Sequence, residues 1–163
     1  MLFRSDTTMS ESYNRGGGVP GLVDVTDATM RALLGTRCLS SPGLAIGTTS
    51  AAAVKIANTT TYIINGVFYS KTTAEIAFTD TTVLADGGTA YYLVCLNAAG
   101  SGLIVNGSAI TGDLPNVPAG YCPIGYVKVV TSGADFTPGT TLLSAATVTD
   151  TYVNISVLPT TLS

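Results

Sequence analysis

The sequence predicts an all-β protein, an antiparallel β-sandwich or barrel that carries an extended N-terminal arm. Strand-like segments with alternating apolar residues recur between short turns through most of the chain. Threonine, which favours strands, occurs 26 times among the 163 residues. Helical periodicity is confined to one short stretch near the N-terminus. Short strands with little helix are typical of sandwiches and barrels.

Charge divides the chain into an N-terminal arm, residues 1–40, and a β-rich body, residues 41–163. Residues 1–37 carry all four arginines and four acids, so their net charge is zero. Residues 38–163 carry three lysines and six acids, a net charge of −3. We expect the boundary between the arm and the body where this distribution of charge changes.

The arm contains a flexible hinge, Gly16-Gly17-Gly18-Val19-Pro20-Gly21. Beyond it, Asp24 or Thr26 could cap a short helix that ends at Gly35, and an extended segment is the alternative. In a helix, Met30, Leu33 and Leu34 would share one face. The arm has too few apolar residues to fold alone, so we expect it to order against the body or a partner.

The clearest signal in the body is Asn65-Gly66 between two apolar segments, which predicts a β-hairpin with a type I′ turn. Asp86-Gly87-Gly88 predicts another turn, and the three prolines of 114–123 predict an irregular crossing loop. Further strands are expected around Val54–Ile56, Ile76–Phe78, Thr89–Asn97, Leu103–Val105, Tyr126–Val129 and Tyr152–Val157, the last with Val153, Ile155 and Val157 on one face.

The expected strand Thr89–Asn97 is apolar on both faces. Tyr91, Leu93 and Cys95 occupy one face, and Tyr92, Val94 and Leu96 the other. One interpretation is a central strand whose second face lies under the proline-rich loop. The other is an oligomer interface that uses Tyr91, Tyr92, Val94 and Leu96. A body with so few charges favours a homo-oligomer, because monomers rarely leave large apolar patches open.

The composition excludes several chemistries. Histidine is absent, which rules out Ser-His-Asp and Cys-His catalysis and histidine-ligated zinc. Cys38, Cys95 and Cys122 show no C-x-x-C spacing, and Cys95 is expected to be buried. We therefore predict no enzyme activity, no catalytic residues, no metal and no cofactor. The acidic balance argues against nucleic acid, and no apolar run is long enough to span a membrane.

The body resembles small virion structural proteins of tailed bacteriophages. The resemblance rests on an ordered series of segments that covers roughly residues 55–157: Thr61–Lys71, Ala90–Gly100, Leu114-Pro115, Pro118-Ala119-Gly120, Pro123–Val129 and Phe136–Thr141. No segment in the series is catalytic. The resemblance implies a trimeric, β-rich protein attached to a virus particle, as a capsid decoration (cement) protein or as a fibre module.

The expected function is therefore that of a cement protein, a homotrimer bound to the major capsid protein on the outer surface of an icosahedral head. The capsid-binding arm would use Arg4, Arg15, Arg31 and Arg37 as ion-pair donors and Met30, Leu33 and Leu34 as anchors. Packing of residues 22–37 on the protein's own body is the alternative for that stretch. The alternative function is a head- or tail-fibre or receptor-binding module, in which exposed Tyr121, Tyr126 and Tyr152 would contact host glycans.

Overall fold

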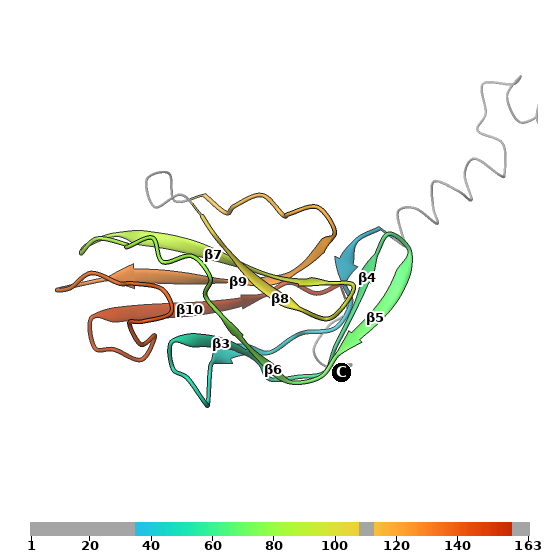
Figure 1. Ribbon diagram of the computed structural model, residues 1–163, viewed down its shortest axis with the longest axis horizontal. Coiled ribbons are helices and arrows are strands. Elements are labelled where there is room, and N and C mark those ends of the chain that lie inside the picture. The colour runs from blue at the N-terminus through green and yellow to red at the C-terminus, as the bar shows by residue number, and fades with distance from the viewer. Residues whose placement is uncertain (1–34, 108–112, 158–163) are drawn as a thin grey trace, which may run out of the picture. The chain divides into compact units, whose positions relative to one another are not determined.

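The structure is a computed structural model that describes residues 35–107 and 113–157. The chain divides between Gly35 and Thr36 into two units, and all the strands of the described residues lie in the second. The described residues form ten strands and no helix, which confirms the all-β prediction (Figure 1). The short helix considered before Gly35 lies outside the described residues.

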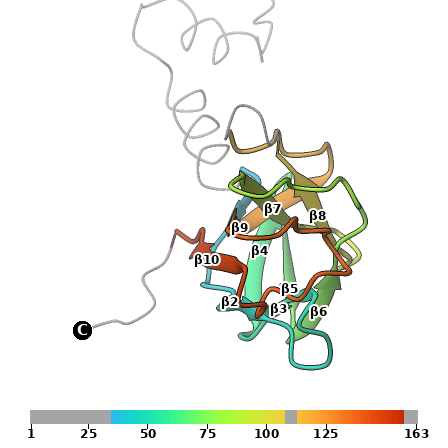
Figure 2. The same ribbon diagram turned by 90° about the vertical axis from the view of Figure 1, so that its left-hand side faces the viewer.

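Ten strands form three antiparallel sheets. Figure 2 shows the four-stranded sheet on one side of the body and the sheet of β2, β3 and β6 on the other, as in a sandwich. The four-stranded sheet has the order β10 (Val148–Asn154), β9 (Tyr121–Thr131), β7 (Thr89–Asn97) and β8 (Gly102–Asn106). The facing sheet has the order β2 (Leu44–Ile46), β3 (Ala53–Ile56) and β6 (Ala74–Ala77). The third sheet has the order β1 (Arg37–Cys38), β4 (Thr60–Ile64) and β5 (Val67–Lys71).

One hydrophobic core fills the space between the sheets. Its centre is a ring cluster in which Phe78 meets Tyr92 edge-on, with centroids 5.2 Å apart, and Phe136 lies 6.1 Å from Tyr92. Phe136 is held there by paired backbone hydrogen bonds with Leu84. Aromatic rings in such edge-to-face contact stabilise a core beyond the area that they bury.

The β4–β5 hairpin has the predicted turn. Asn65 and Gly66 both have positive φ, 50° and 83°, and Ile64 pairs directly with Val67 across the turn. A type I′ turn requires positive φ at both central positions, and asparagine and glycine are the residues that tolerate it best. The sequence signal therefore set both the turn type and the register of this hairpin.

A short segment after β10 joins two of the sheets. The Ile155 N–H donates to the Ile124 carbonyl of β9 at 2.9 Å, and the Val157 N–H donates to the Cys38 carbonyl of β1 at 3.0 Å. At the end of β10 itself, Asn154 Oδ1 accepts a hydrogen bond from the Leu44 N–H of β2 at 2.8 Å, which links the four-stranded sheet to the facing sheet.

Two strand predictions were wrong in detail. The last strand was expected to continue to Val157 with Val153 on its buried face, but β10 ends at Asn154 and Tyr152 packs against the core. Strand β9 was expected to begin after Pro123, yet it starts at Tyr121. Pro123 pairs with Cys95 of β7, and the β7–β9 ladder shifts register between Val94 and Cys95. Such an irregularity is a place where a sheet accommodates a proline, which has no N–H to donate.

Candidate functional site

The hairpin strand β5 exposes two neighbouring large apolar side chains, one on each face of the strand. Val67 is 52% exposed and Phe68 is 59% exposed. β5 is also an edge strand of its sheet. Exposed apolar side chains often mark an interaction site. An edge strand also leaves backbone N–H and C=O groups unpaired, so it can pair with a strand of another chain.

Phe68 belongs to a row of side chains that crosses this sheet. The ladder pairs Arg37 of β1 with Ile63 of β4, and Ile63 with Phe68 of β5. Directly opposed residues in an antiparallel sheet share a face. Arg37 and the exposed Phe68 ring therefore lie on the same face, which is opposite to the face that carries the core residues Cys38 and Tyr62.

The structure describes one of the seven residues predicted for the capsid-binding arm. Arg37 lies in β1 and is half-buried, so it is part of the body's sheet although it was assigned to the arm. The other six lie outside the described residues: Arg4, Arg15, Met30, Arg31, Leu33 and Leu34.

The oligomer interface predicted on β7 is corrected by the structure. Tyr92, Val94 and Leu96 point into the chain's own core, and none is more than 1% exposed. Tyr91 is on the opposite face and is half-buried. Leu93 and Cys95 share that outer face and are buried too. The segment 113–120 runs over this side of β7 and β8 (Figure 1), as the first of the two interpretations of this strand expected.

The tyrosines proposed for glycan contact do not lie together. Tyr152 faces the core, and its hydroxyl is buried. Tyr126 is on the outer face of β9, where its ring lies 5.8 Å from that of Tyr91. Lys128 Nζ lies 6.0 Å from the centre of the Tyr91 ring, so this half-buried pair and one cation form a small aromatic surface.

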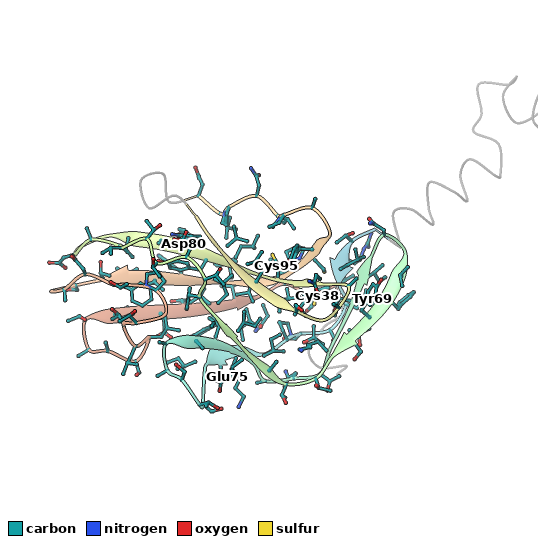
Figure 3. The ribbon with its side chains drawn as sticks, in the orientation of Figure 1. Cys38, Tyr69, Glu75, Asp80 and Cys95 are labelled. Carbon is teal, nitrogen blue, oxygen red and sulfur yellow. The ribbon has the colours of Figure 1, made fainter. Side chains whose placement is uncertain are left out.

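Glu75 has a structural role that the sequence did not reveal. Its Oε1 accepts hydrogen bonds from the N–H of Thr48 at 2.6 Å and from that of Thr49 at 2.7 Å, while Oε2 accepts one from the Ser50 N–H at 3.2 Å. The Thr48 hydroxyl also donates to Oε1. These hydrogen bonds, that of Thr49 first, lower the pKa of Glu75 to about 2. The carboxylate thus fixes the loop between β2 and β3 (Figure 3).

The three cysteines are buried free thiols. Burial raises the pKa of Cys38 to about 11, and raises those of Cys95 and Cys122 to about 12. A thiol reacts as the thiolate, so these residues are poorly suited to nucleophilic chemistry. The prediction that Cys95 is a buried small hydrophobe is confirmed.

The described part of the chain holds no group of three or more His, Cys, Asp or Glu side chains that could bind a metal. Within residues 35–107 and 113–157, no helix is long and apolar enough to cross a membrane. Comparisons with protein-family models, with curated proteins and with solved structures found no match to this chain.

Proposed function

We propose that the protein is a phage capsid decoration protein that acts by binding, not by catalysis. It would attach as a homotrimer to the major capsid protein on the outer surface of the head. The attachment and the trimer rest on the resemblance to small virion proteins. The structural support is the row from Arg37 to Phe68, which places a cation and an exposed aromatic ring on one face of the sheet of β1, β4 and β5.

That face adjoins the point where the N-terminal arm enters the body, because β1 begins at Arg37. A contact made by Phe68 and a contact made by the arm would then reinforce each other through their covalent link. Three copies in a trimer would multiply this effect. Since only an assembled shell would offer all the contacts together, binding would stabilise the shell by linkage.

The trimer contact has to use residues other than Tyr92, Val94 and Leu96, because these fill the core. Of the four residues first predicted for the interface, Tyr91 is the one on a partly exposed face.

Occupancy on purified particles tests the proposal. Deleting residues 1–21 should reduce the number of copies bound, and so should Phe68→Ser. Val83→Ser is the matched control, because Val83 is also an apolar residue, 50% exposed, in a segment outside this sheet. Undiminished occupancy of both the deletion and Phe68→Ser would contradict the proposed attachment.

A fibre or receptor-binding module is the second candidate function. The observation in its favour is the Tyr91–Tyr126 pair with Lys128 beside it, since aromatic rings with a polar neighbour are suited to sugar binding. Copy number separates the two candidates, because hundreds of copies per particle fit cement, and a few to tens fit a fibre. Binding of the isolated protein to a glycan array would favour the second.

A further inference from the structure

The backbone of β5 directs some of its polar groups toward the open edge of its sheet. In β4, the Thr61 carbonyl accepts a hydrogen bond at 2.9 Å from the residue that follows β1, so it points away from β5. Successive residues of a strand direct their backbone groups to alternate sides. Tyr62 therefore bonds to its partner Tyr69 in β5. Phe68 and Ser70, on either side of Tyr69, direct their N–H and C=O groups to the open edge.

This edge lacks the features that usually keep an edge strand from pairing. Such strands are protected by proline, by charged side chains or by a bulge. The five residues Val67–Lys71 contain no proline and a single charge at the end, and their ladder with β4 is regular. Within the described residues, β5 has no second partner strand, and no hydrogen bond reaches the backbone groups of Phe68 or Ser70. The edge, at the rim of the body in Figure 1, is open to another strand.

We propose that the edge of β5 binds a second copy of this chain, with the two β5 strands antiparallel about a two-fold axis at Tyr69. Phe68 of one copy then lies opposite Ser70 of the second copy, and the two residues exchange both backbone hydrogen bonds. The same pair recurs on the other side of the axis, as an isologous contact requires. At the axis the two Tyr69 residues face each other, and each ring is already held by stacking on Tyr62 of its own copy, with centroids 5.6 Å apart.

The strand is complementary to its own reverse, which favours a second copy over an unrelated strand. The large Phe68 ring lies beside the small Ser70 of the second copy, so the two side chains do not compete for space. Lys71, the only charge, lies opposite Val67, whose side chain is 52% exposed. The two lysines are then about 13 Å apart along the strands, which is farther than the screening length of about 8–10 Å. Like charges therefore do not meet in the pair.

The other registers that keep these hydrogen bonds are shifted by two residues, and both are less favourable. One shift places Gly66 opposite Ser70, but Gly66 belongs to the turn and has φ of 83°, so it does not continue the strand. The opposite shift places the two Lys71 side chains diagonally on one face, roughly 7–8 Å apart, where like charges repel. The register centred on Tyr69 is the one that pairs every residue of β5.

The contact goes beyond the proposed attachment, because it uses the edge of β5, whereas attachment uses a face of its sheet. Five residues from each copy are fewer than the 20–30 of a standard interface. We therefore expect weak association, with a Kd on the order of 10⁻⁵ M. A two-fold contact does not close a trimer. In a trimer it would instead join one trimer to the next.

Sedimentation of the full chain, with no capsid present, tests the contact. Between roughly 1 and 200 μM, which brackets the expected Kd, the mass should double reversibly, from monomer to dimer or from trimer to hexamer. Ser70→Pro removes the N–H that the second copy needs and no bond to β4, and sheet edges accept proline. It should weaken association at least about tenfold and keep the native circular dichroism spectrum. Ser70→Ala is the matched control, because it keeps the N–H, and it should associate as the parent protein does.

Disulfide formation tests the register. At the axis the two Cα atoms of residue 69 would lie about 4.5 Å apart, which a disulfide can bridge, so Tyr69→Cys should form a covalent dimer under mild oxidation. Ser70→Cys is the control, because its two copies would lie roughly 8 Å apart, beyond that reach. The parent protein should form no covalent dimer, since its cysteines are buried.

Three results would overturn the inference: a mass that does not change with concentration, unchanged association of a folded Ser70→Pro variant, or a disulfide in Ser70→Cys and not in Tyr69→Cys. Should Ser70→Pro fail to fold, the Tyr69→Cys disulfide decides. A chain of constant mass whose Ser70→Pro variant loses occupancy on particles would assign the edge to a strand of the capsid protein instead, which also overturns the inference.

Discussion

Replacing Leu96 by alanine should weaken the fold of the body, whereas replacing Phe68 by alanine should weaken it far less. Leu96 is fully buried in the central strand β7, between Cys122 of β9 and Gly102 of β8. Truncation of a buried leucine removes transfer free energy and leaves a cavity, so the free energy of unfolding should fall by about 3–4 kcal/mol. Phe68 is 59% exposed, and with less than half of its side chain buried the same truncation should cost roughly 1 kcal/mol.

Guanidinium unfolding followed by circular dichroism measures this difference. With a denaturant slope of about 3 kcal/mol/M for a body of this size, Leu96→Ala should lower the midpoint by about 1 M, and Phe68→Ala by about 0.3 M. Analytical ultracentrifugation of the same variants under native conditions gives the oligomeric state. The reasoning would be refuted if Leu96→Ala left the unfolding midpoint unchanged and dissociated an oligomer, because Leu96 would then be an interface residue.

Two substitutions and one labelling experiment test the local structure. Hydrogen bonds hold the pKa of Glu75 at about 2, below the ordinary value of 4.5, so the carboxylate's contribution to stability is complete above pH 4.5 and is lost as the pH falls toward 2. Glu75→Gln should therefore speed amide hydrogen exchange in the loop between β2 and β3 at pH 6 and make exchange there less dependent on pH. An unchanged exchange rate would contradict this role. Gly66→Ala should lower the free energy of unfolding by about 1–2 kcal/mol in thermal or chemical denaturation, because Gly66 has φ of 83°, and a neutral effect would argue against the type I′ turn. Cys38, Cys95 and Cys122 should react with a thiol reagent slowly in the native protein and all three rapidly in guanidinium, since burial raises their pKa values to about 11 and 12; one fast thiol under native conditions would show that its site opens.

Local signals in the sequence were sufficient for much of the fold. Asn65-Gly66 defined a turn, and Thr89–Asn97 matched β7 at both ends. These features depend on backbone conformation and on short-range apolar patterns, which a sequence records directly. The short strands β1 and β2 were missed because two or three residues carry no periodicity.

The side of a strand that faces the core was harder to predict. In β10 the alternation of Val153, Ile155 and Val157 indicated the wrong face, because Tyr152 packs against the core instead. In β7 both faces are apolar, so the pattern could not separate core from interface. Burial of that kind depends on which segments cover the strand, and these are distant in the sequence.

The candidate surface could likewise be predicted only in part from the sequence. Arg37 was selected from its charge, but its position in a row with Phe68 depends on the pairing of β1, β4 and β5. Val67 and Phe68 were not selected, although two adjacent apolar residues on a strand must point to opposite faces, which is a signal of an exposed side.

The hydrogen bond from Val157 to Cys38 has a practical consequence. It brings the last described residues beside the first strand, so the two ends of the body are neighbours in space. A short linker from residue 157 to residue 36 could close this body into a ring. New ends could then be opened in the loop after β7, to give a circular permutant whose fold is the same but whose attachment points lie elsewhere on the body.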